Sequence, residues 1–403
     1  MPASQSQVAN ILMADFTYPL PPERIAQHPV EPREAAKLLV WEKGELHDAH
    51  FTDLPTLLPP SSLLILNDTK VIHARLEFRK PQGGRVEVFL LEPQSPSNYE
   101  ESFSALHSCS WRCLIGNAKR WHTEPIALTL PDGTVLQATR AEQEGNSIVR
   151  LSWASSLPFG QLLQQAGAIP IPPYLKRDAT PEDSIWYQTV FARASGSVAA
   201  PTAGLHFSGA LLQSIAQAGH TLGYSTLHVG AGTFLPVKSP RIGGHAMHRE
   251  SIAVPRATIQ KLLEHPGPII PVGTTALRTI ESLYWIGYQL LNAPQPPTPL
   301  GVEQWLPYQA YDTPTPQRAL EALLTHLDST HADTLHATTN LLIAPGYTPR
   351  IAHGLITNFH QPESTLLLLV ACLMGPDWRR AYQHALAHGY RFLSYGDGML
   401  ILP

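Results

Sequence analysis

The chain carries hydrophobic patterns of two kinds, and the change from one to the other divides it. Continuous apolar runs typical of buried strands lie at residues 38–41, 63–66 and 269–272. Between about residues 74 and 154 the apolar positions instead alternate in short runs, separated by turn residues such as Gly83 and by no helical pattern. Short strands without intervening helices are typical of a small antiparallel barrel. The pattern therefore predicts the α/β class: a mixed-sheet α/β domain of residues 1–73 and 156–403, with an antiparallel β-barrel domain inserted at 74–155.

Residues 196–237 combine two segments rich in small residues with a helix between them. Ser208 is placed to cap that helix, and Gly219 stands where its C-terminal cap belongs. Residues 221–229 then alternate as a strand that ends in a glycine-rich turn, which is where open α/β sheets bind ligands. The predicted centre of the site consists of two histidines and their small neighbours: His206, His228, Thr202, Gly204, Gly230, Gly232 and Thr233.

Two patterns near the end of the chain predict further elements. The segment 364–374 is apolar on all sides, which predicts a helix buried in the core. The segment 390–402 has the alternation of a hairpin, with its turn at residues 396–398.

Composition narrows the possible classes of protein. A length of 403 residues agrees with two domains, and a net charge of −4 means that RNA would have to be bound by local basic patches. Three cysteines form no disulfide framework, and the first residues lack the basic and apolar segments of a secretion signal. The longest apolar run, 366–374, is far shorter than the ~20 residues of a membrane span. We expect a cytoplasmic monomer that makes no contact with membranes.

A possible anion site follows the strand at 269–272. Thr274, Thr275 and Arg278 begin the next helix, where free N–H groups and a guanidinium would bind a carboxylate or phosphate. Arg278 and Glu281 also have the spacing of an ordinary surface ion pair, which is the alternative.

Two histidines and a glutamate stand close together at His245, His248 and Glu250. The histidine spacing differs from the four-residue spacing of helical zinc proteases. In an extended segment His248 and Glu250 share one face, which favours a general acid/base or substrate-orienting pair. We expect no metal, and a metal site formed by all three residues is the alternative.

Three polar residues later in the chain and several basic residues are further candidates for binding substrate or RNA. Asn358 and His360 alternate to one side of a strand end and could read a heterocyclic base, and Asp397 adds a carboxylate at a turn. The basic residues that could bind RNA phosphates are Lys119, Arg120, Lys176 and Arg177. Ordinary capping groups and solvated faces are the alternatives.

Motifs along nearly the whole chain resemble the S-adenosylmethionine:tRNA ribosyltransferase-isomerase family of queuosine biosynthesis. The two most specific are VAAPTAGLHF at 198–207 and TLHVGAGTF at 226–234. The others lie at 15–16, 20–21, 67–69, 74–76, 187–190, 245–250, 272–278, 357–360 and 390–397.

The resemblance implies an α/β domain that carries a β-barrel domain, and S-adenosylmethionine as co-substrate without a bound cofactor or metal. It also implies that the ribosyl group of the donor, rather than its methyl group, is transferred to the aminomethyl-deazaguanine base in the tRNA anticodon. On this expectation adenine and methionine leave, and epoxyqueuosine is formed.

Such a reaction requires proton transfers. The sulfonium acidifies the neighbouring ribosyl methylene, so a base is needed there, and the departing adenine needs an acid. His206, His228 and His248 with Glu250 are the candidates for these tasks, and the sequence does not divide the roles among them. The methionine carboxylate would bind at the helix start near Arg278.

The chain departs from the family pattern at Lys37, Lys70, His73, His353 and Gln361. A lysine in place of an arginine loses a bidentate fork, and a histidine in place of an aspartate changes the charge. These departures leave a paralogue with a different acceptor as an alternative. A metal-dependent hydrolase that uses His245, His248 and Glu250, and a non-catalytic RNA-binding module, are two others.

Overall fold

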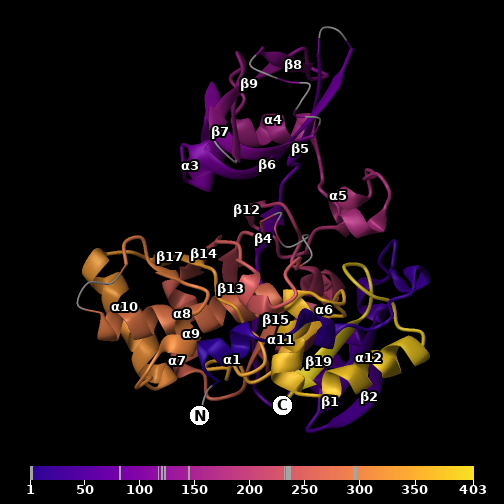
Figure 1. Cartoon of the computed structure of the whole chain (residues 1–403), viewed down its shortest axis with the longest axis vertical. Coiled ribbons are helices and arrows are strands. Elements are labelled where there is room, and N and C mark those ends of the chain that lie inside the picture. The colour runs from indigo at the N-terminus through magenta and orange to yellow at the C-terminus, as the bar shows by residue number, and fades with distance from the viewer. Residues whose placement is uncertain are drawn as a thin grey trace.

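The structure is a computed structural model that describes residues 3–80, 83–116, 118, 121, 124–143, 146–230, 232, 237–293 and 297–403. A large α/β unit forms the lower part of Figure 1, and a smaller unit made mainly of strands, with helices α3 and α4, stands on it. The two chain ends both lie on the α/β unit.

The α/β unit is built on a mixed sheet. In spatial order its strands are β16 (Gly301–Val302), β17 (Thr334–Thr339), β14 (Glu250–Pro255), β13 (Thr221–Leu227), β3 (Leu63–Asn67), β15 (Ile269–Val272), β18 (Leu355–Asn358), β19 (Gly398–Leu402), β1 (Lys37–Glu42) and β2 (Glu45–His50). β13, β3, β15 and β18 run parallel to one another, whereas β14, β19 and β2 each pair antiparallel with a neighbour. The predicted mixed α/β class is confirmed.

The helices of the described chain are α1 (Gln5–Ala9), α2 (Leu54–Leu57), α3 (Tyr99–Ser104), α4 (Phe159–Ala166), α5 (Asp183–Trp186), α6 (Gly209–Gln217), α7 (Arg256–Glu264), α8 (Thr274–Asn292), α9 (Leu306–Gln309), α10 (Pro316–Thr330), α11 (Thr365–Met374) and α12 (Asp377–Ala387). None of the helices in this described part is long and apolar enough to cross a membrane.

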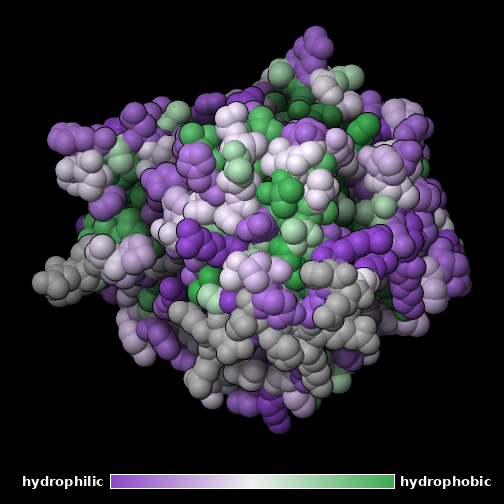
Figure 2. All heavy atoms as spheres, turned by 90° about the horizontal axis from the view of Figure 1, so that it is seen from above, coloured by the Kyte–Doolittle hydropathy of each residue, from purple (hydrophilic) through white to green (hydrophobic). Residues whose placement is uncertain are grey.

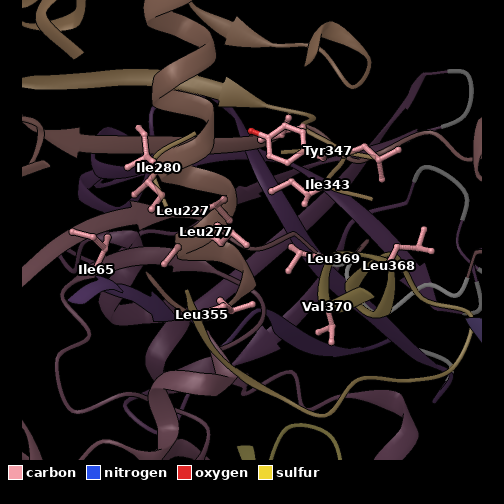
Figure 3. Packing of buried hydrophobic residues seen from close by; sticks show 14 of the residues in the cluster. Ile65, Leu227, Leu277, Ile280, Ile343, Tyr347, Leu355, Leu368, Leu369 and Val370 are labelled. Atoms are coloured by element: carbon pink, nitrogen blue, oxygen red, sulfur yellow. The ribbon is translucent and has the colours of Figure 1, made fainter. Parts of the chain in front are cut away.

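The central strand β3 shows why both faces of the sheet are covered. All of its residues are apolar up to Asn67, and successive side chains point to opposite faces. Leu63 and Ile65 pack with α8 and α11 in the larger core, part of which Figure 3 shows. Leu64 and Leu66 pack with α6 in a second core. An uninterrupted apolar run is therefore what a strand between two helical layers requires.

Two predicted helices are confirmed. The Ser208 hydroxyl caps α6 by accepting from the Leu211 backbone N–H at 3.1 Å, and Gly219 follows the helix at φ +89°. The apolar segment near the C-terminus is α11, capped by Ser364 and largely buried.

The predicted hairpin at 390–402 is wrong. Only β19 is a strand there, and its partners β1 and β18 come from distant parts of the chain. The residues before it form a loop that Asp397 holds, because its carboxylate accepts from the backbone N–H of Arg391 and of Lys37.

The smaller unit is the predicted antiparallel barrel. Its strands are β5 (Arg75–Arg79), β6 (Arg85–Ser95), β7 (Ser108–Gly116), β10 (Asn146–Ser152), β9 (Val135–Gln143) and β8 (Ile126–Thr129), and a pairing of β5 with β8 closes the sheet. Alternate residues such as Leu76 and Phe78 fill the interior with Trp111. The short strand β11 (Gly167–Ala168) pairs with β5, and Phe159 of α4 shares the barrel core. The division at 73/74 and 155/156 stays a prediction.

Two short strands connect the units. β4 (Thr69–Val71) continues from the end of β3, and β12 (Ala194–Ser197) pairs with it in parallel. Both lie between the barrel and the α/β unit in Figure 1.

Candidate active site

A cavity of about 150 Å³ opens where the central parallel strands end. Parallel strands bring their carboxyl ends to one edge of the sheet, so the segments after β13, β15 and β18 meet there. Nine of the predicted site residues line the cavity: Thr202, Gly232, His248, Glu250, Thr274, Thr275, Arg278, Asn358 and His360. Lining residues that no sequence pattern indicated as part of a site include Tyr174, Tyr187, Met247, Leu341, Phe359, Leu369 and Ser394.

Arg278 and Glu250 form a buried ion pair in the wall of the cavity. The Arg278 Nη1 donates to Glu250 Oε2, and its Nε donates to the Leu341 carbonyl at 3.1 Å. Exposure is 7% for Arg278 and 4% for Glu250. The Arg278 Nη2 is buried and has no partner in the described part of the chain. The guanidinium thus keeps one donor for a ligand in the cavity.

Arg278 does not form the alternative surface pair with Glu281. The Glu281 side chain is fully buried, and its carboxylate accepts from the backbone N–H groups of Arg350, Ile351 and Ala352. Glu281 therefore anchors a turn behind the cavity, and the sequence spacing alone could not distinguish the two partners.

The first turn of α8 faces the cavity. Gly273 precedes the helix at φ +92°, a backbone conformation that favours glycine, and no side chain in the described part of the chain caps the helix start. Asn67 at the end of β3 holds the turn in place, because its Nδ2 donates to Thr275 Oγ1 at 3.2 Å and to the Leu227 carbonyl. A helix start of this kind favours an anion.

His248 lies at the cavity mouth over a glycine. It is exposed, and a Cβ added at Gly232 would overlap its imidazole ring. Its ring centroid is 6.4 Å from that of His245, whose pKa burial lowers. The Glu250 carboxylate faces Arg278, and no group of three His, Cys, Asp or Glu residues in the described chain could hold a metal ion.

Replacing Gly232 with alanine is expected to displace the His248 ring and to reduce turnover, while the melting temperature changes little because the site is near the surface. Steady-state kinetics and a thermal melt of the variant measure both effects. Unchanged kinetics would show that the position of His248 does not matter for the reaction.

His206 lies behind Asn358 rather than in the cavity lining. Its Nε2 is 3.3 Å from Asn358 Nδ2, and its ring stacks on Phe51 at 4.1 Å. Asn358 also donates to the Leu393 carbonyl, and its Oδ1 is buried with no partner among the described residues. We infer that His206 orients Asn358.

Burial keeps two of these histidines neutral. It lowers the pKa of His206 to about 3, with a further contribution from the Arg391 charge, and that of His360 also to about 3. The His360 Nε2 pairs with Thr357 Oγ1 at 2.8 Å. Neutral imidazoles are suited to orienting polar ligands, and an imidazolium would be needed for donation of a full proton.

The free energy of unfolding is expected to fall as the pH drops from about 6.5 towards 3. The unfolded chain takes up a proton on His206 below its ordinary pKa of 6.5, whereas the folded chain does so only near pH 3. This one group contributes up to about 1.4 kcal/mol per pH unit in that window and nothing above it. Urea unfolding at pH 7 and pH 5 should show a shallower loss for His206→Gln than for the parent. Equal losses would contradict the buried, neutral state.

His228 also lies outside the cavity lining. Burial lowers its pKa to about 4, and its Nδ1 pairs with Thr69 Oγ1 at 2.9 Å. The next residues turn back to the cavity: Val229 lines it, and the Gly230 N–H donates to Glu250 Oε1 at 3.3 Å.

The other predicted site residues lie elsewhere. Gly204 is packed tightly against Phe191 and Thr189, and the buried Asp397 binds the loop described above. The guanidinium of Arg177 donates two hydrogen bonds to the Asp183 carboxylate, at 2.7 and 2.8 Å, while Lys176 is exposed. Their predicted substrate or tRNA contacts stay predictions, and the remaining ones lie outside the described residues: Thr233, Lys119 and Arg120.

Of the five departures from the family pattern, only Gln361 lines the cavity. The Lys37 Nζ donates to the His388 carbonyl, and His353 Nδ1 accepts from the Ile269 N–H. Lys70 is exposed, and His73 Nδ1 pairs with the Gln164 carbonyl oxygen.

The chain is similar to known proteins over nearly its whole length. A family model described as queuosine biosynthesis protein matches residues 13–300 and 310–401. The S-adenosylmethionine:tRNA ribosyltransferase-isomerase of Gloeobacter violaceus is 40% identical over 98% of this chain and 97% of its own. The enzyme of the same name from Syntrophotalea carbinolica is 39% identical, over 97% of this chain and 99% of its own. The solved S-adenosylmethionine tRNA ribosyltransferase of Thermotoga maritima is 26% identical, covers 96% of this chain and 100% of its own, and has a TM-score of 0.47.

A family match over this span, together with relatives near 40% identity, decides the classification. The chain belongs to the queuosine biosynthesis family and is a transferase-isomerase of the S-adenosylmethionine:tRNA ribosyltransferase-isomerase type.

Proposed function

We propose that the protein transfers the ribosyl group of S-adenosylmethionine to the aminomethyl-deazaguanine base of a tRNA anticodon and isomerises it. The products are tRNA bearing epoxyqueuosine, adenine and methionine. The observation that carries the proposal is the buried Nη2 of Arg278, which has no partner among the described residues and lies beside the open start of α8, in a cavity with His248 at its mouth.

The methionine end of the donor binds at this helix start. Its carboxylate accepts from the free Nη2 of Arg278 and from the first-turn N–H groups near Thr274, where the helix dipole favours negative charge. The Glu250 carboxylate already neutralises part of the Arg278 charge, and it would remain near the cationic sulfonium and ammonium groups of the donor. The adenine lies against the apolar part of the wall, which includes Leu341, Phe359 and Leu369.

His248 carries the proton transfer at the ribosyl methylene. It lines the cavity and is exposed there, whereas His206 and His228 lie behind other residues. Glu250 is held by Arg278 and the Gly230 N–H, so we assign it a positioning role rather than that of a free base. The acceptor amine attacks as the neutral base, and its new carbon–nitrogen bond replaces the ribosyl bond to adenine. The deprotonated methylene carbon then bonds to that same carbon and closes the cyclopentane as the ring oxygen leaves it, and this oxygen displaces methionine to form the epoxide.

The tRNA binds through local patches of basic residues rather than through the net charge of the whole protein. The net charge is −4, and the face in Figure 2 mixes hydrophilic and hydrophobic residues. Lys70 and Lys176 are exposed, and both belong to the segments that connect the barrel with the α/β unit. Phosphate contacts of this kind make the affinity fall with salt. We propose that the protein works in the cytoplasm as a monomer, with no bound cofactor.

Isotopic labels in the donor test the reaction. We expect label in the ribosyl carbons of S-adenosylmethionine to enter tRNA that bears the aminomethyl-deazaguanine base, methyl label to leave as methionine, and one adenine to be released per transfer. Methyl label retained on the RNA, without release of adenine, would contradict the proposal.

A second acceptor is the one alternative that an observation favours. Gln361 departs from the family pattern and lines the cavity, so it could alter which base is accepted. Ribosyl transfer to tRNA that lacks the aminomethyl-deazaguanine base would identify this alternative, because the donor half of the reaction would be unchanged.

A further inference from the structure

An aromatic side chain of the barrel contacts the His228 imidazole of the α/β unit. Tyr99, the first residue of α3, has its ring centroid 4.4 Å from that of His228, with 36° between the planes. α3 lies on the side of the barrel near β12 and β4 in Figure 1. On its other side Tyr99 contacts Trp111 of the barrel core at 5.9 Å. This aromatic pair therefore joins the two units directly.

The connecting strands close around the same pair. Thr69 of β4 pairs with the His228 Nδ1 at 2.9 Å. Gly196 of β12 has φ +153°, and a Cβ added there would lie 2.7 Å from the His228 ring and 2.8 Å from the Tyr99 ring. Only glycine fits so close to both rings, so the contact is tightly packed.

The segment that follows His228 forms part of the cavity. The Val229 N–H donates to Ser197 Oγ at 2.8 Å, and the Gly230 N–H donates to Glu250 Oε1 at 3.3 Å. Gly232 supports the ring of His248. The side chain of His228 thus touches the barrel, while the backbone within four residues of it holds Glu250 and His248.

We propose that Tyr99 is a positioning residue for the reaction, through which the docked barrel holds residues 228–230 and Gly232 in the arrangement that the donor cavity requires. Without the ring, water reaches the imidazole, and the segment gains freedom at the point where it enters the cavity. The site assigned to S-adenosylmethionine is then complete only when the barrel sits on the α/β unit. This inference rests on the proposed function.

Tyr99→Leu tests the proposal, with Phe103→Leu as its matched control. Phe103 lies in the same helix and contacts Trp111 and Phe159 of the barrel core, so its loss perturbs the barrel without removing the ring on His228. We expect Tyr99→Leu to lower kcat or donor affinity by about 10- to 100-fold, as displacements of about 1 Å in a site do. Phe103→Leu should stay close to the parent, and Tyr99→Phe, which keeps the ring, should retain activity.

Two further measurements separate positioning from stability. Hydrogen exchange should speed up in residues 228–232 of folded Tyr99→Leu, and the His228 pKa should rise from about 4 towards 6.5 in an NMR titration. Gly196→Ala displaces the same rings without substituting any residue of the barrel, and we expect it to reproduce the kinetic loss even if Tyr99→Leu does not fold. Parent-like kinetics in Gly196→Ala, or equal losses in Tyr99→Leu and Phe103→Leu, would overturn the proposal.

Failure of the proposed function would be seen differently. In that case the parent protein itself would transfer no ribosyl label, whereas binding of S-adenosylmethionine and hydrogen exchange at 228–232 would still report on the role of Tyr99. Exchange rates unaffected by Tyr99→Leu would overturn the positioning role under either outcome.

Discussion

Replacing Arg278 with lysine is expected to weaken the binding of S-adenosylmethionine by about 10- to 150-fold. Hydrogen bonds to charged groups contribute about 1.5–3 kcal/mol, and each 1.4 kcal/mol is a factor of ten. The planar guanidinium reaches Glu250, the Leu341 carbonyl and, through its free Nη2, the cavity. A lysine ammonium is a point charge on a flexible stem and cannot make all three contacts at once.

Calorimetric titration of the donor measures this loss. Arg249→Lys is the matched control, because Arg249 pairs with Glu303 on the exposed surface nearby and does not line the cavity. The control should bind like the parent. If Arg278→Lys also binds like the parent, the methionine end of the donor lies elsewhere.

Replacing Glu250 with alanine is expected to lower the free energy of unfolding by about 3–5 kcal/mol, because it leaves the Arg278 charge buried without its partner. Removing one partner of a buried pair costs more than the pair itself contributes, since the remaining charge cannot reach water. The Gly230 N–H loses its acceptor as well. Turnover should therefore fall together with stability.

Urea denaturation of two further variants isolates the cause. Glu303→Ala removes a carboxylate from the exposed Arg249 pair and should cost only about 0–1 kcal/mol. The double variant Glu250→Leu with Arg278→Met removes both charges and should lose less stability than Glu250→Ala alone. Equal costs for Glu250→Ala and Glu303→Ala would show that water reaches the Arg278 pair.

Several site residues could be selected from the sequence because of their chemistry and their place at strand ends. Thr274 follows a strand that the apolar pattern predicts, Asn358 and His360 were placed at a strand end by their alternation, and parallel strands bring such ends together. The sequence did not indicate Met247 or Tyr174 as lining residues, because nothing in their local pattern distinguishes a cavity wall from ordinary packing. The two-domain division, and the tRNA and substrate contacts, stay predictions.

Features that depend on neighbouring residues along the chain could be predicted from the sequence. Period and capping are local properties, so the buried strand β3, the barrel strands and the Ser208 cap of α6 could be read from it.

Which distant groups meet depends on the packing of the whole chain. Arg278 pairs with Glu250, 28 residues away, rather than with Glu281 three residues later, because the start of β14 and the first turns of α8 both lie in the wall of the cavity. β19 pairs with β1 and β18 instead of forming a hairpin, and His228 faces the barrel instead of the cavity. Such contacts depend on the register and packing of segments far apart in the chain, and no local pattern of side chains records them.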